Sequence, residues 1–168
     1  MLRAALLILL AALPAHGQSF DDAVRANVSL ATRTCITAML SGIPPEALFQ
    51  QAGFVYRGMD RGVNDFGVRL GTSHYFDAPA DTAKAEVPNI GAPAGLCTVT
   101  TTHMREVPFA ALVAQTIFAQ FPYAQTTGLH RWTLRQGNGL PLIVSVSTIT
   151  RHRYEAPGTV EVSMSFPG

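Results

Sequence analysis

The sequence predicts a single α+β domain in which an antiparallel sheet of about 4–6 strands carries two main helices packed on one face. Two patterns carry this prediction. Apolar residues recur every three or four positions in residues 20–38 and again in residues 109–120, which is the period of an amphipathic helix. In about the last forty residues, apolar and polar side chains alternate in three runs separated by glycine-containing turns, as in strands with one buried face.

The first helix is predicted to begin after Ser19 and to end at Gly42. Ser19 with Asp22 three residues later is similar to a capping box, with aspartate in place of the usual glutamate. Gly42, followed by Pro44 and Pro45, stops the helix. Its apolar stripe consists of Phe20, Val24, Val28, Ala31, Cys35 and Ala38.

Shorter elements are expected between the two main helices. Pro45 starts a second, short helix that ends at Gly53. A short strand follows at residues 54–56 and a weaker one at residues 66–70. Residues 74–93 are rich in Ala, Pro and Asp and have no sustained period, so we expect a long irregular excursion over the surface. Such a stretch inside a compact domain is more often functional or mobile than neutral.

The second half of the chain supplies most of the predicted sheet. A strand at residues 95–103 places Cys97 and Val99 on one face, and the second main helix starts near Pro108 and ends before Pro122. The single tryptophan of the chain is expected to be a core residue. The inward-facing positions of the last three strands are His130, Trp132, Leu134, Leu142, Val144, Val146, Val160, Val162, Met164 and Phe166.

Residues 1–17 are predicted to be a secretory signal peptide, and residues 18–168 the single α+β domain. Arg3 provides the positive start, an uninterrupted run of ten apolar residues follows, and the small residues Ala15 and Gly17 suit cleavage after residue 17. Ten apolar residues are too few to span a bilayer, which needs roughly 20. No later segment is apolar enough either, so we expect no membrane insertion after signal cleavage.

The charge balance argues against some classes of partner. Removal of Arg3 leaves eleven basic and eleven acidic residues, and a net charge near zero does not favour nucleic-acid binding, which depends on clustered positive charge. All the basic residues except Lys84 are arginine, which we attribute to genomic base composition and hence to a bacterial source. The expected location is therefore the periplasm or the medium, and the sequence indicates no cofactor.

The chain contains two cysteines, Cys35 and Cys97. An even number of cysteines in an exported chain predicts a disulfide in an oxidising compartment. Two buried free thiols or a metal pair are the alternatives. The wide spacing excludes a C-x-x-C redox or zinc motif.

The densest run of charge and glycine lies at residues 57–67. It fails the pattern of an EF-hand, because the twelfth position from Asp60 is Gly71 instead of glutamate. It also fails the pattern of a Walker loop, because Val68 follows Gly67 where a lysine is required. We expect solvated turns, with a binding or catalytic role as the alternative. The candidate binding residues in and near this loop are Arg57, Asp60, Arg61, Asp65 and His74.

A second candidate surface is the polar face of the predicted sheet. Arginines on a rigid sheet can hold carboxylates or phosphates through paired hydrogen bonds, so this face suits a carbohydrate, an anionic metabolite or a partner protein. The alternative is a solvated face that keeps the sheet from aggregating. The residues expected on it are Arg131, Arg135, Arg151, Ser145, Ser147, Glu161, Ser163 and Ser165.

Catalytic motifs are weak. The sequence contains no G-x-S-x-G elbow, and no two of the four histidines of the mature chain have the spacing of a metal site on one helix or strand. We therefore expect a small exported domain, without catalytic activity, that binds a protein or a small anionic or carbohydrate ligand. An inhibitor or an envelope accessory factor is one version of this function.

Two other functions remain as alternatives. One is a small periplasmic hydrolase with a site between residues 57–67 and 74–93. If it is correct, Asp60, Asp65, His74 and His103 should meet in a cleft. The other is a structural subunit of an envelope assembly, for which an apolar patch at a sheet edge would be evidence.

Overall fold

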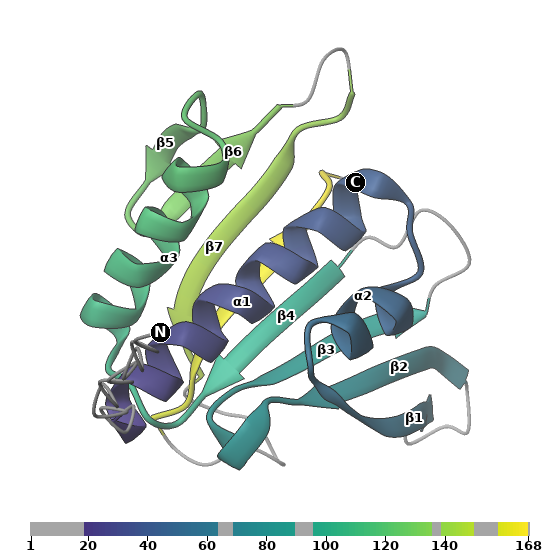
Figure 1. Cartoon of the computed structure of the whole chain (residues 1–168). Coiled ribbons are helices and arrows are strands. Elements are labelled where there is room, and N and C mark those ends of the chain that lie inside the picture. Colours follow the sequence, from purple (N-terminus) through teal and green to yellow (C-terminus); the bar gives the residue numbers. More distant parts are fainter. Residues whose placement is uncertain (1–18, 64–68, 90–95, 136–138, 150–157, 168) are drawn as a thin grey trace, which may run out of the picture.

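The computed structural model describes residues 19–63, 69–89, 96–135, 139–149 and 158–167. Within these ranges, three α-helices lie against one face of a single antiparallel sheet of eight strands (Figure 1). The predicted α+β class with an antiparallel sheet is therefore confirmed. The sheet is wider than predicted, and a third helix joins the two main ones on the same face.

The sheet consists of two four-stranded meanders joined edge to edge. Its order is β1-β2-β3-β4-β8-β7-β6-β5, so the last strands of the two meanders, β4 and β8, are neighbours at its centre. The strands are β1 (Val55–Val63), β2 (Arg69–Asp77), β3 (Lys84–Asn89), β4 (Leu96–Thr101), β5 (Gln125–Gly128), β6 (Arg131–Leu134), β7 (Leu142–Thr148) and β8 (Val160–Ser165).

Helix α1 (Phe20–Ser41) crosses the middle of the sheet and packs mainly on β4. Its predicted cap is confirmed, because the Ser19 side chain accepts a hydrogen bond from the Asp22 backbone N–H at 3.1 Å. The helix ends at Gly42, whose positive φ of 68° is a conformation that glycine adopts without steric cost.

Two further helices complete the layer. Helix α2 (Pro45–Gln51) begins at a proline, as predicted, and lies against β1, whereas α3 (Glu106–Gln120) packs on β7 and β8. A short 3-10 helix, η1 (Pro79–Asp81), connects β2 to β3.

The core lies between the helix layer and the sheet. Cys35 of α1 and Cys97 of β4 are both fully buried there, and they form a disulfide with a Cα–Cα distance of 5.8 Å. The predicted bridge is confirmed. Trp132 is 5% exposed and belongs to the same apolar cluster, so the predicted inward face of β6 is also confirmed.

The prediction of solvated turns at residues 57–67 is wrong for residues 57–63, which belong to β1. The strand forms the sheet edge and contains a bulge at Arg57 and Gly58, where the φ of Gly58 is 117°. An edge strand is solvated along one side, and a bulge breaks the alternation of its side chains, so charge and glycine are compatible with a strand here. Residues 64–68 lie outside the described residues.

The predicted irregular excursion over residues 74–93 is also wrong in its described part. It contains the end of β2, then η1, then β3. The inward residues Ala83, Ala85 and Val87 are mostly small, so they give little hydrophobic signal. Pro88 is tolerated because, among the described residues, β4 pairs with β3 only as far as Glu86, so no pairing with β4 is recorded at the proline.

The remaining differences concern the second meander. The four-residue β5 was not predicted, and all its residues are exposed. His130 was expected to face the core within a strand. Instead it has a φ of 52° and occupies the turn before β6, with Nε2 3.8 Å from Glu106 Oε1. A left-handed residue cannot continue a strand, so β6 starts one residue later than predicted.

Candidate ligand-binding groove between two helices

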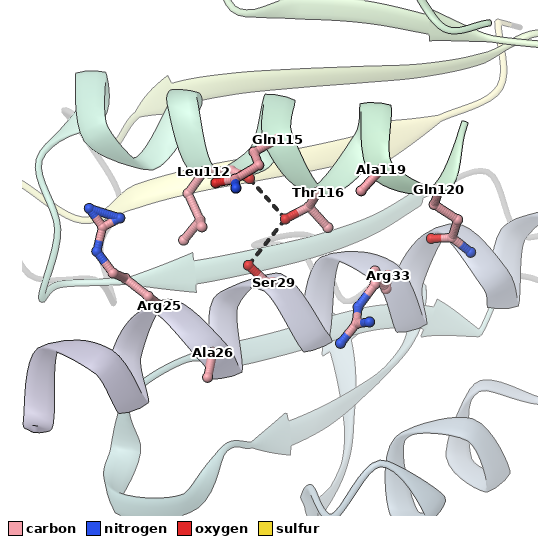
Figure 2. A pocket seen from close by; sticks show the side chains of 9 residues that line it. All are labelled: Arg25, Ala26, Ser29, Arg33, Leu112, Gln115, Thr116, Ala119 and Gln120. Atoms are coloured by element: carbon pink, nitrogen blue, oxygen red, sulfur yellow. Dashed lines mark hydrogen bonds between the residues drawn. The ribbon is translucent and has the colours of Figure 1, made fainter. Parts of the chain in front are cut away.

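A groove of about 680 Å³ lies between α1 and α3 on the outer surface of the helix layer (Figure 2). Its volume falls within the roughly 300–1,000 Å³ of typical ligand sites. The lining residues are Arg25, Ala26, Ser29, Arg33, Leu112, Gln115, Thr116, Ala119 and Gln120.

Helical spacing explains how one wall of the groove forms. Arg25, Ser29 and Arg33 are four residues apart, so they stand one above another on successive turns of α1. The neighbouring stripe of Val24, Val28 and other apolar residues is buried against the sheet. The polar stripe is therefore directed along the outer side of α1, next to α3.

The floor of the groove is a hydrogen-bonded contact between the helices. The Thr116 hydroxyl donates to the Leu112 carbonyl at 2.8 Å and lies 3.1 Å from Ser29 Oγ. A hydroxyl has one hydrogen, so Thr116 shares it between two acceptors, the Leu112 carbonyl and Ser29 Oγ. Because Ala26 and Ala119 flank this contact with only a methyl group each, they leave space above it.

The charged side chains of the groove are all positive. Arg25 and Arg33 are exposed, and neither forms an ion pair with a carboxylate among the described residues. No acidic side chain lines the groove. The two guanidinium groups are therefore free to bind an anion, and they remain charged at any physiological pH.

The lining suits binding better than proton transfer. Arginine does not act as a general base, and none of the described lining residues is His, Cys, Asp or Glu. The exposed amides of Gln115 and Gln120 each offer both a donor and an acceptor. The groove can thus hold an anionic, hydrogen-bonding ligand, with paired contacts to carboxylate or phosphate oxygens.

The candidates from the 57–67 region occupy the other end of the sheet. Arg57 Nε donates to Asp77 Oδ2 at 2.6 Å, which ties the bulged edge strand to β2. Asp60 and Arg61 belong to β1, but their side chains lie outside the described residues, as does all of Asp65. The binding roles of these residues stay predictions.

His74, the remaining candidate of that group, contacts both α2 and the edge strand β1. Its Nδ1 atom lies 3.0 Å from Glu46 Oε1 and 3.1 Å from the Tyr56 hydroxyl. Its Nε2 atom is buried and has no hydrogen-bond partner among the described residues. These contacts make His74 a link between α2 and the first two strands.

The predicted hydroxyl-rich face has the expected arrangement where it is described. The strand register places Arg131, Ser145 and Ser163 side by side across β6, β7 and β8, on the face away from the helices. The Oγ atoms of the two serines are 3.1 Å apart. Arg135 follows β6 and is exposed, whereas Arg151 lies outside the described residues. A ligand-binding role for this face stays a prediction.

The two described histidines of the proposed hydrolase site do not meet. Asp77, Lys84 and Thr100 form one row across β2, β3 and β4. Because β2 and β4 run in the same direction, His74 lies three residues before this row along β2 and His103 three residues after it along the chain from β4. The two histidines are therefore on opposite sides of the row. Within the part of the chain that the structure describes, no three His, Cys, Asp or Glu residues form a group that could hold a metal ion.

The sequence contains a signal for the groove that motif analysis missed. Arg25, Ser29 and Arg33 at four-residue spacing indicate a cationic stripe on one side of a helix. The spacing does not indicate which element lies beside that stripe, and a groove exists only because α3 does.

Comparison with protein-family models, with curated proteins and with solved structures found no match. The functional assignment therefore rests on the geometry of the molecule. None of the described helices is long and apolar enough to cross a bilayer.

Proposed function

We propose that this protein is an exported domain without catalytic activity that binds an anionic ligand or partner protein in the groove between α1 and α3. The observation that carries the proposal is the pair of arginines, Arg25 and Arg33, on either side of the Ser29–Thr116 contact, neither of which has an ion-pair partner among the described residues. An envelope accessory factor and an inhibitor are both versions of this function.

The disulfide supports the exported location. Bridges of this kind persist in oxidising compartments, and a fully buried one between α1 and the central strand β4 braces the layer that carries the groove. The signal-like start of the sequence supports the same location.

Export predicts a shortened mature protein. We expect mass spectrometry of the protein recovered from cells to find an N-terminus within a few residues of Gln18, because the small residues Ala15 and Gly17 mark the cleavage site. Substitution of Gly17 by a bulky residue should slow cleavage. An intact Met1 on most of the wild-type protein would contradict the proposal of export.

Groove binding predicts cross-linking from one side of α3 only. A photoreactive amino acid at Ala119, which lines the groove, should capture the ligand or partner in cells. The same group at Phe118 is the matched control, since Phe118 is exposed on the same helix but does not line the groove. We expect no comparable adduct from Phe118.

The charge of the groove is tested in the same experiment. The double substitution Arg25→Gln, Arg33→Gln should clearly lower the yield of the Ala119 adduct and leave the fold intact, because both side chains are exposed. An adduct of equal yield in this variant, or equal yields from Phe118 and Ala119, would show that the groove is not the binding site.

One observation favours the alternative of a structural subunit. Tyr123 (58% exposed) and Leu129 (88% exposed) flank the edge strand β5. The strand itself is four residues long and has a register irregularity between Thr126 and Gly128. Short, bulged edges oppose the addition of a further strand, so we place groove binding first.

A further inference from the structure

We infer that the occupant of the α1–α3 groove is an extended acidic peptide segment of a partner protein, with two carboxylates four residues apart. This inference rests on the proposed function, and it specifies the chemistry and the conformation of the ligand. It follows from the spacing of the arginines, from the glutamine amides and from the small residues between them.

The arginine spacing sets the distance between the two anionic groups. Arg25 and Arg33 are eight residues apart in one helix, and a rise of 1.5 Å per residue separates their Cα atoms by about 12 Å along the axis. An extended chain advances about 3.3 Å per residue, so acids four residues apart span about 13 Å. Side chains at i and i+4 of an extended chain also project to the same side. Both carboxylates can therefore face α1 together.

The glutamines favour an extended chain over a helix. Gln115 and Gln120 present amide donors and acceptors at the α3 wall of the groove (Figure 2). An extended peptide has free main-chain N–H and C=O groups that can pair with such amides, whereas a helix satisfies these groups internally. Ala26 and Ala119 leave room for a main chain to approach.

The charges favour a peptide over a nucleic acid or a membrane. The mature chain is predicted to have no net charge, and the groove concentrates only two cations. Two exposed arginines can match two carboxylates. They do not provide the series of phosphate contacts on which nucleic-acid binding depends.

The test uses synthetic peptides with blocked ends and NMR spectra of the mature, oxidised protein. The main probe is an acetylated and amidated peptide rich in Ser and Ala, with glutamates at positions i and i+4. Three control peptides have glutamates at i and i+3, glutamines at i and i+4, or glutamates eight positions apart in a helix-forming sequence. In the helical control the carboxylates also span about 12 Å, so it separates conformation from charge spacing.

We expect the i, i+4 peptide to shift the backbone signals of residues 25–33 and 112–120 and to bind more tightly than all three controls. Arg25→Gln or Arg33→Gln should each weaken binding about threefold and the double substitution about tenfold, because each exposed ion pair contributes less than about 1 kcal/mol. Arg105→Gln, an exposed arginine outside the groove, should leave the affinity unchanged. Higher salt should weaken binding of the wild-type protein.

Other results would overturn the inference, and they distinguish it from the proposed function. Equal affinity for all acidic peptides, with dependence on the two arginines, would show a groove that binds anions without the inferred spacing. Tighter binding of the helical peptide would identify a helix as the occupant. Absence of binding by every peptide, together with a groove-specific adduct at Ala119, would show that the ligand is not an acidic peptide. The proposal that the groove is the binding site would stand. Absence of both would overturn the inference and the proposed function together.

Discussion

Loss of the Cys35–Cys97 disulfide is expected to lower the free energy of unfolding by about 4 kcal/mol. The two cysteines are 62 residues apart, so the bond closes a long loop in the unfolded chain and restricts its conformational freedom. Both residues are fully buried, in α1 and in the central strand β4. A typical domain is stable by roughly 5–15 kcal/mol, so this single bond supplies a large share of the stability.

The measurement compares denaturant unfolding of the oxidised wild-type protein with that of the double variant Cys35→Ala, Cys97→Ala. The wild-type protein with its disulfide reduced is the matched control, because it retains both sulfur atoms and lacks only the bond. We expect both bond-free forms to unfold at lower denaturant concentration. A steeper dependence on denaturant should accompany this change, because an unfolded chain without the cross-link exposes more surface. A loss of less than about 1 kcal/mol in both forms would contradict the prediction.

The parts of the fold that could be predicted are those where burial repeats at a regular period. Val24, Val28 and Cys35 recur at the helical period and are all buried. In β7 and β8, every second residue is buried against the helices. Both patterns arise because one face of each element meets the core and the other does not. That asymmetry is visible in the sequence before any tertiary structure is known.

The elements that were missed lie at the sheet edges or face the core with small residues. In β5 all four residues are exposed, so no alternation exists to detect. In β1 the bulge at Arg57 and Gly58 breaks the period, and in β3 the inward residues are alanine and valine. Strand formation in these segments is determined by the pairing partner, which sequence alone does not identify.

Of the candidate binding surfaces, one could be predicted from the sequence and the other could not. The row of Arg131, Ser145 and Ser163 could be predicted, because alternation within each strand fixes which side chains share a face. The groove could not be predicted as a whole, since the lining residues of its two walls are more than seventy residues apart in sequence. The stripe of Arg25, Ser29 and Arg33 was visible, and so was the second main helix, but the sequence does not show that this helix lies beside the stripe.

Substitution of Trp132 by alanine is expected to lower the free energy of unfolding by about 3–5 kcal/mol, because it removes a large buried ring and leaves a cavity. Trp132 is 5% exposed and lies in the core cluster, between Thr126 of β5 and Val144 of β7. Within the described part of the chain, the edge strand β5 pairs with β6 alone. We therefore expect the second meander to lose packing at its outer end in this variant.

Two further variants distinguish the effect of losing the Trp132 ring from the effect of any substitution in β6. Trp132→Phe keeps an aromatic ring in the core, so its loss should be clearly smaller than that of the alanine variant. Thr133→Ala changes the next residue, which faces the opposite side of the sheet, and should cost only about 1 kcal/mol, because it removes one exposed hydrogen bond to Thr127. Circular dichroism during denaturant unfolding measures all three variants, since the only tryptophan of the chain is absent from two of them. Similar losses for Trp132→Ala and Thr133→Ala would show that β6 does not bury alternate residues, and the register that places Arg131 beside Ser145 would then be wrong as well.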